Sequence, residues 1–175
     1  ILQLHSQMIQ KQNKYTVVSV SDLTSRIFYG TRASRTYVRD KKNAIPFLTG
    51  ASILLNNFDN TKLVSKKYTP AIEEMTLHEG WVLITRSGTV GQVAWSNKLF
   101  EGKYGSEDII RVVPNGRMKG GVIYAFLASK DGNPLLTQGA FGAVIQHIEP
   151  NFVGDICLPE FDESLQNKIN KNEYI

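Results

Sequence analysis

Four consecutive residues, Arg86 to Thr89, join side chains that bind anions to the sequence of a tight turn. Arg86 supplies a guanidinium, Ser87 and Thr89 supply hydroxyls, and Gly88 allows the backbone to reverse direction. Groups of these kinds bind phosphate oxygens and the edges of nucleic-acid bases. We therefore interpret Arg86, Ser87 and Thr89 as a candidate binding tip. The alternative is a core hairpin whose turn is merely polar.

A second candidate surface is the segment 30–43, GTRASRTYVRDKKN, which has the composition of a loop. Its basic side chains alternate with hydroxyls and one aromatic ring, a combination typical of surfaces that contact phosphates and bases. The alternative is a solvated loop that binds no ligand. The candidate nucleic-acid contacts in this segment are Arg32, Ser34, Arg35, Tyr37, Arg39, Lys41 and Lys42.

Charge is distributed unevenly along the chain. The net charge is +4, but residues 1–67 contain eleven basic and three acidic residues, a net charge of +8, and the remainder carries −4. This asymmetry favours an anionic partner, with a solvated basic surface as the alternative. Two further loops each contribute one candidate contact. Lys103 is a cation, and Phe141 is an aromatic ring that either stacks on a base or packs in the core.

Residues suited to catalysis lack a usable spacing. The three histidines are not spaced as metal ligands, and the single cysteine has no neighbouring base that would activate it. No phosphate-binding loop and no dinucleotide fingerprint occurs. We therefore expect a binding module that is not an enzyme and holds no metal. The remaining catalytic alternative is a hydrolase or transferase whose site assembles in the fold from Glu107, Asp108 and His147.

The composition is that of a globular domain with a real core. The chain has 175 residues, of which 42% are hydrophobic and 21% charged. No stretch approaches the roughly 20 consecutive apolar residues of a membrane span, so we expect no membrane contact. The single Cys157 excludes an internal disulfide and is consistent with a reducing compartment, which we take to be the cytoplasm.

An apolar hairpin must position the turn at 86–89. Residues 81–86 predict a strand buried on both faces, and the apolar pattern resumes from Val90 to Trp95. Further short strands and helices around it indicate an α+β fold. Residues 21–27 predict a short helical turn, and residues 62–68 predict an edge strand whose lysines discourage further pairing.

The two ends of the chain predict helices that point away from the body. Residues 1–12 have apolar residues at helical spacing. Near the other end, Phe161, Leu165 and Ile169 fall four apart and form a narrow stripe, typical of a helix that packs against one partner helix. The predicted organisation is therefore a body at 13–160 between terminal helices at 1–12 and 161–175.

Several segments together resemble a known family. They are IPFLTG at 45–50, LHEGWVLITRSGTVG at 77–91, GSEDIIRVVPN at 105–115 and GAFGAVIQHIEPNFVGDICLPEF at 139–161. Their order resembles the target-recognition domain of the specificity subunit of type I restriction-modification enzymes, over about residues 16–170. In that family an apolar strand leads into a Gly-Thr-Ile-Gly-like turn, and SGTVG at 87–91 stands in that place.

The chain departs from the family pattern near its end. Family members commonly carry a proline pair followed by Glu-Gln and Ile before a spacer helix, and only Pro159, Gln166 and Ile169 remain here. The resemblance implies a compact, many-stranded α+β recognition domain that reads one half of a split target in double-stranded DNA. It also implies that the terminal helices belong to a spacer bundle, which would contact a second recognition domain or a second copy of the chain.

The resemblance places catalysis elsewhere. Methylation and restriction would belong to partner subunits, with S-adenosylmethionine bound to the methylation subunit and no cofactor in this chain. The recognition domain of a fused restriction-methylation enzyme fits the same motifs equally. From the residues alone, the other alternative is a module that binds RNA or single strands by stacking bases. The aromatic residues available for stacking are Tyr29, Tyr37, Tyr104 and Phe141.

Overall fold

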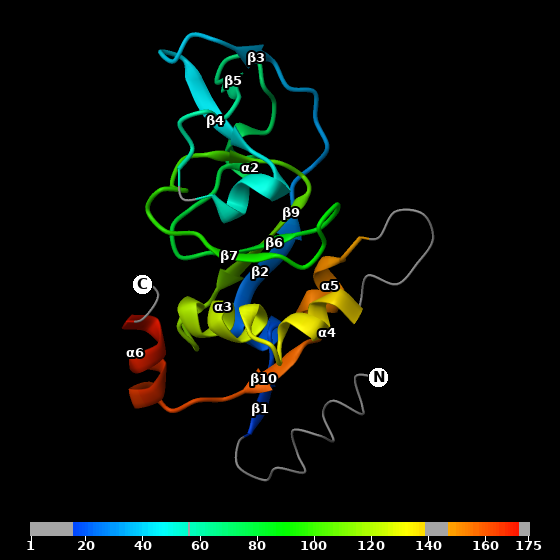
Figure 1. Cartoon of the computed structure of the whole chain (residues 1–175), viewed down its shortest axis with the longest axis vertical. Coiled ribbons are helices and arrows are strands. Elements are labelled where there is room, and N and C mark those ends of the chain that lie inside the picture. Colours follow the sequence, from blue (N-terminus) through cyan, green and yellow to red (C-terminus); the bar gives the residue numbers. More distant parts are fainter. Residues whose placement is uncertain (1–15, 56, 139–146, 172–175) are drawn as a thin grey trace.

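The computed structural model describes residues 16–55, 57–138 and 147–171. The molecule is elongated, with a small sheet at one end, a central sheet in the middle and a layer of helices at the other end (Figure 1). The predictions of a helix at 1–12 and of a contact at Phe141 lie outside the described residues. The α+β class is confirmed.

The central sheet has four antiparallel strands and contains the predicted hairpin. The predicted hairpin forms, and its strands pair Ile84 with Val93. Val82 and Ile84 face the main core, whereas Leu83 faces a second apolar cluster, so the strand is buried on both sides. The strands in spatial order are β2 (Thr24–Tyr29), β9 (Ile109–Pro114), β6 (Val82–Thr85) and β7 (Val93–Trp95).

The helical turn predicted at 21–27 is wrong beyond its first residues. A 3₁₀ helix, η1 (Ser21–Leu23), is followed at once by β2. The strand begins at Thr24 because β9 pairs with it in an antiparallel ladder, in which the register shifts between Thr24 and Arg26 and Ile27 lies opposite Val112. The predicted turn does begin at Ser21, without a side-chain cap hydrogen bond, but a partner strand far along the chain sets its end.

The small sheet and the elements around it form the distal lobe, residues 31–76 together with β8. Its strands in spatial order are β3 (Tyr37–Val38), β5 (Leu63–Ser65), β4 (Ala44–Leu48) and β8 (Tyr104–Gly105), and β4 and β8 run parallel. The 3₁₀ helix η2 (Gly50–Leu54) and helix α2 (Ile72–Met75) complete it. Ile45, Phe47, Val64, Met75 and Tyr104 form its core.

The edge strand predicted at 62–68 is also wrong. β5 is an inner strand of three residues, paired with β4 on one side and β3 on the other. Tyr37 lies opposite Val64, a pairing that the loop-like composition of 30–43 concealed. Lys62 and Lys66 flank the strand instead of guarding its edge.

A buried arginine joins the distal lobe to the central sheet. Arg111 is 0% exposed on β9, and its guanidinium donates four hydrogen bonds to carbonyl oxygens. The acceptors are Ser106 (3.0 Å), Ile109 (2.6 Å), Gly105 (2.8 Å) and Met75 (3.3 Å). Burial lowers the pKa of Arg111 to about 10, so the side chain stays charged at neutral pH.

The end opposite the distal lobe is closed by helices and a two-stranded ladder. Helix α6 packs against α3, and Lys119 N donates to Gln166 Oε1 at 3.0 Å. Phe161 and Ile169 pack against the main core, so the narrow stripe finds its partner helix within this chain and does not point away from the body. The elements are β1 (Val17–Ser19), α3 (Gly120–Ala128), α4 (Asn133–Gln138), α5 (Pro150–Gly154), β10 (Cys157–Pro159) and α6 (Glu163–Lys171).

Candidate nucleic-acid interface

The hairpin turn is held rigidly at its base. Ser87 Oγ donates to Asp108 Oδ1 at 2.6 Å, and Arg86 N donates to the Asp108 carbonyl at 2.8 Å. Thr85 Oγ1 donates to the Thr89 carbonyl, and Gly88 and Gly91 take the positive φ angles (74° and 81°) that the reversal requires. Of the predicted tip residues, only Thr89 is exposed.

Arg86 is already bound within the protein. Its side chain is 16% exposed, and Nη2 lies 2.6 Å from Glu149 Oε1. Its guanidinium also stacks on Tyr29, with Cζ 3.9 Å from the ring centroid. Glu149 is 54% exposed, so this ion pair lies at the surface with its acidic side toward solvent.

Two arginines of the loop after β2 lie close to Glu107, the residue before Asp108. Arg35 forms an ion pair with Glu107, and the two side chains are 17% and 15% exposed. Arg32 lies 3.8 Å from the same carboxylate but is 91% exposed. The Arg35 guanidinium also lies over the Phe47 ring of the distal lobe, with Cζ 4.7 Å from the ring centroid.

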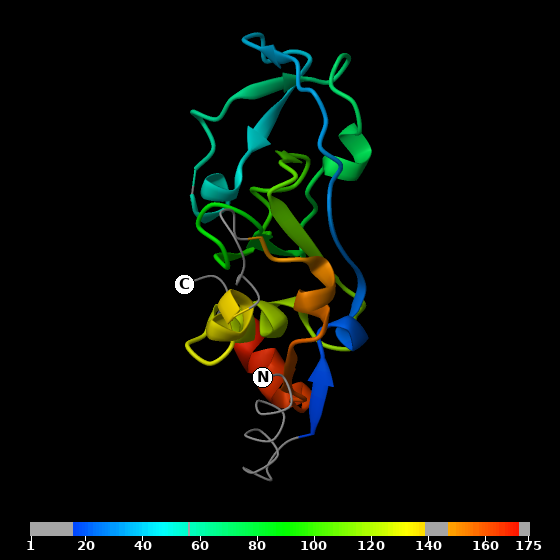
Figure 2. The same ribbon diagram turned by 90° about the vertical axis from the view of Figure 1, so that its right-hand side faces the viewer.

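Glu107 and Asp108 therefore bring the two predicted segments together. Glu107 binds the 30–43 loop and Asp108 binds the hairpin turn, while Glu149 covers Arg86 from a third segment. We call these three carboxylates with Arg32, Arg35, Arg86 and Ser87 the acidic junction. Figure 2 shows the 30–36 segment running from the end of β2 past the central sheet to the distal lobe.

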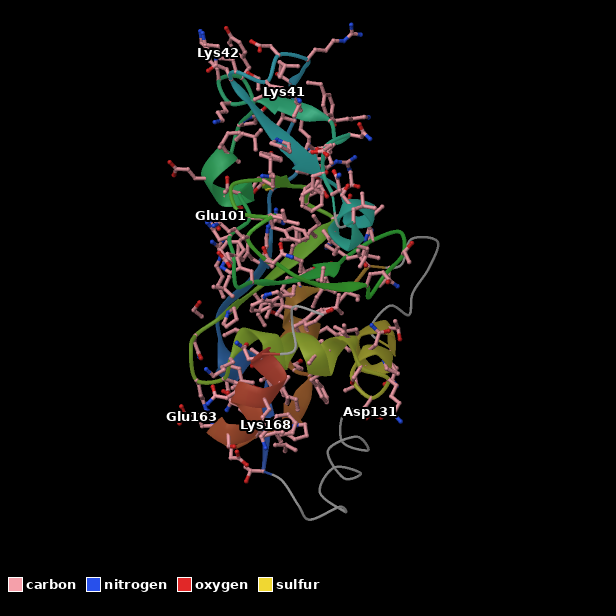
Figure 3. All side chains as sticks on the ribbon, turned by 60° about the vertical axis from the view of Figure 1, so that its left-hand side comes forward. Lys41, Lys42, Glu101, Asp131, Glu163 and Lys168 are labelled. Carbon is pink, nitrogen blue, oxygen red and sulfur yellow. The ribbon has the colours of Figure 1, made fainter. Side chains whose placement is uncertain are left out.

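A second group of cations lies at the far end of the distal lobe. Figure 3 shows Lys41 and Lys42 at the end of the molecule opposite Lys168 of α6. Lys66 joins them because its backbone N–H donates to the Asn43 carbonyl at 2.9 Å. We call Arg39, Lys41, Lys42 and Lys66 the distal basic tip. All four are exposed, and none forms an ion pair within the described parts of the chain.

The remaining predicted contacts are distributed between these groups. Ser34 is exposed on the segment that joins the junction to the distal lobe. Tyr37 is 50% exposed and lines a groove in that lobe. Lys103 is half-buried, and its carbonyl accepts a hydrogen bond from Leu77 N at 2.8 Å. Lys66 was missed by sequence reasoning, since only the β4–β5 register brings it to the tip.

The structure also bears on the base-stacking and catalytic alternatives that the sequence left open. Tyr104 is 0% exposed in the core of the distal lobe, so its role as a base-stacking residue is wrong. Glu107 and Asp108 are engaged by Arg35 and Ser87, and His147 Nδ1 is buried without a hydrogen-bond partner among the described residues. Within the same residues, no group of three or more histidine, cysteine or acidic side chains could hold a metal ion.

Burial raises the pKa of the Cys157 thiol, which disfavours the reactive thiolate. Across the described residues, no helix combines the length and the apolar character needed to cross a membrane.

The architecture described above is the one found in type I restriction-modification systems. The S subunit of such a system from M. genitalium matches 90% of this chain with a TM-score of 0.56 and 11% identity. A chain from a structure concerned with complex assembly and conformational transition of the type I R-M system matches 98%, with a TM-score of 0.68 and 15% identity. The HsdS subunit from Thermoanaerobacter tengcongensis matches 91%, with a TM-score of 0.53 and 14% identity.

These similarities confirm the resemblance at the level of the fold. No protein-family profile and no curated protein sequence matches the chain. The chain covers 38%, 44% and 38% of the three solved chains, so it spans less than half of each.

Proposed function

We propose that this chain is a target-recognition domain that binds double-stranded DNA sequence-specifically. It would read one half of a split target for a type I restriction-modification complex. The distal basic tip is the observation that carries the proposal, because four exposed cations at one end of this fold suit a phosphate backbone. The fold shared with S subunits supports it.

The distal basic tip and the acidic junction would have different roles in binding. The exposed cations of the distal basic tip contact phosphates and supply affinity, which falls steeply as salt rises. The acidic junction fixes the hairpin turn beside the duplex, with Thr89 exposed and Arg86 held by Glu149. Arginine reads guanine through two parallel hydrogen bonds, so Arg86 can read a base only after it leaves this carboxylate.

The proposal assigns no catalysis to this chain. Methylation and restriction would be performed by partner subunits in the cytoplasm, with S-adenosylmethionine on the methylation subunit. A second recognition domain or a second copy of this chain would read the other half of the target, with the terminal segments as the site of contact.

The test compares two variants that lose the same charge at opposite ends of the molecule. Lys41→Gln/Lys42→Gln removes two cations of the distal basic tip. Lys130→Gln/Lys168→Gln removes two exposed lysines, of which Lys168 lies at the other end and Lys130 precedes Asp131 in the sequence. A duplex selected from a randomised library is titrated by fluorescence anisotropy at two salt concentrations. The tip variant should reduce the slope of log K against log salt by about 1.8, since each phosphate contact contributes about 0.9.

The control variant should leave the slope unchanged. Equal effects of the two variants would show that net charge, and not the distal basic tip, determines binding. Absence of binding to any duplex at low salt, with the methylation subunit present, would end the proposal. Stronger binding to single-stranded RNA than to duplex would favour the alternative module, for which the exposed ring of Tyr37 remains available.

A further inference from the structure

A groove of about 580 Å³ in the distal lobe has the chemistry of a nucleotide site. Its apolar walls are Tyr37 from β3, Phe47 from β4 and Leu55 after η2. Tyr37 and Leu55 are 50% and 51% exposed, which leaves large apolar surfaces open to solvent. Grooves of a few hundred Å³ with apolar walls and a few polar groups are typical ligand sites.

The aromatic wall is fixed from behind. The Tyr37 and Phe47 rings meet edge to face, with centroids 6.0 Å apart and planes at 74°. Pairing of Tyr37 with Val64 holds the backbone of the same residue in the small sheet. A ring held in this way offers a flat surface on which a base can stack with little loss of conformational freedom.

The polar lining carries one charge, and it is positive. Among the described residues that line the groove, Lys62 is the only charged one. Its Nζ lies 5.3 Å from the Tyr37 ring centroid. A base that takes this place on the ring frees the exposed ammonium for a phosphate. Asn60 is exposed and makes no side-chain hydrogen bond within the described residues, so its amide can pair with a base edge.

The groove and the distal basic tip lie at opposite ends of the paired strands β4 and β5. Lys66 N donates to the Asn43 carbonyl at the tip, and four residues earlier the Lys62 carbonyl accepts from Phe47 N at 2.7 Å in the groove. Four residues of strand span about 13 Å. This distance corresponds to roughly four base steps of one DNA strand. A DNA strand whose phosphates contact the tip is therefore long enough to reach the groove.

We propose that this groove binds one unpaired nucleotide of the DNA, with its base on Tyr37, its edge at Asn60 and its phosphate at Lys62. A concave site cannot receive a base that is still stacked in a duplex. DNA methyltransferases extrude their target base, which leaves the opposite base without a partner. The assignment rests on the proposed DNA-binding function and adds a site to it.

The experiment compares a fully paired duplex with the same duplex carrying one unpaired 2-aminopurine. The chain should bind the second duplex about tenfold more tightly, because stacking of one base on an aromatic side chain strengthens binding by about this factor. The 2-aminopurine emission should also change on binding. Tyr37→Leu and Lys62→Gln should reduce that preference, and Tyr37→Phe should retain it. Asn60→Asp, which adds a carboxylate at an exposed position, should also reduce it.

A second tyrosine–lysine pair in the same lobe provides the matched control. Lys67 lies 5.1 Å from the ring of Tyr68, which is 64% exposed, but neither residue lines the groove. Tyr68→Leu and Lys67→Gln should therefore retain the preference for the unpaired base. Tight binding to paired duplex with no preference, or equal losses in the Tyr37 and Tyr68 variants, would overturn the site and leave the proposed function standing. Tighter binding to single-stranded RNA than to the unpaired duplex would also overturn it.

Discussion

The acidic junction and the distal basic tip contain similar residues held in opposite ways. At the junction, Arg35 and Arg86 are 17% and 16% exposed, and each is paired with a carboxylate. At the tip, Lys41 and Lys42 are exposed and form no ion pair within the described residues. Basic residues in a loop therefore do not all have the same function. Their carboxylate partners decide whether they hold the fold together or remain available to an anion.

Arg111 is a third kind of arginine, fully buried and bonded only to carbonyl oxygens, with which the paired and the exposed cations can be compared. Arg111→Ala should lower the free energy of unfolding by about 3–5 kcal/mol, since it leaves buried carbonyl groups unpaired. Arg111→Lys should recover only part of this loss, because an ammonium cannot reach all four acceptors. Urea denaturation followed by circular dichroism measures both values.

Arg117 serves as the control for that experiment. It is 51% exposed and pairs with Glu160 at 2.8 Å, so Arg117→Ala should leave the stability almost unchanged. An equally small effect of Arg111→Ala would show that the distal lobe is joined to the central sheet by other contacts.

The acidic junction should contribute to the stability of the fold, and substitution of Glu107 tests this. Glu107→Gln removes the charge that holds Arg35 and should destabilise the chain by about 1–3 kcal/mol, because both side chains are largely buried. DNA affinity should fall as well, since the 30–36 segment loses its anchor. Denaturation and anisotropy on the same variant separate the two effects. Higher affinity at unchanged stability would mean that Glu107 only masks a binding charge.

Glu149 should behave in the opposite way. It is 54% exposed, so Glu149→Gln should change stability little. Loss of its charge leaves Arg86 on Tyr29 with an uncompensated cation beside the hairpin turn, and DNA affinity should rise by about threefold at low salt. Anisotropy titrations at two salt concentrations measure the gain. Unchanged affinity would place Arg86 outside the DNA-binding surface.

Local patterns in the sequence predicted the centre of this fold well. The β6–β7 hairpin follows from two runs of apolar residues bounded by turn residues, and its pairing confirms it. The edge strand at 62–68 and the helical turn at 21–27 failed because strand pairing depends on residues far along the chain. β5 became an inner strand only because two residues of an apparently polar loop pair with it.

The candidate site was predicted in its residue types but not in its electrostatics. Arg86 and Arg35 have no acidic neighbour at a spacing that would reveal Glu149 or Glu107 as partners. Arg111 was hidden in an apolar run, where its burial depends on carbonyls from three segments. The groove beside Tyr37 likewise assembles from β3, β4 and the loop before β5, which no local pattern brings together.

The hydrogen bonds of Arg111 make the connection between the distal lobe and the central sheet stiff. A protein with such a joint cannot adapt its shape to a duplex that touches both the hairpin turn and the distal lobe. The double helix would have to bend or twist instead, and the energy of that deformation depends on base sequence. Base steps that no side chain touches would thereby influence which targets are selected.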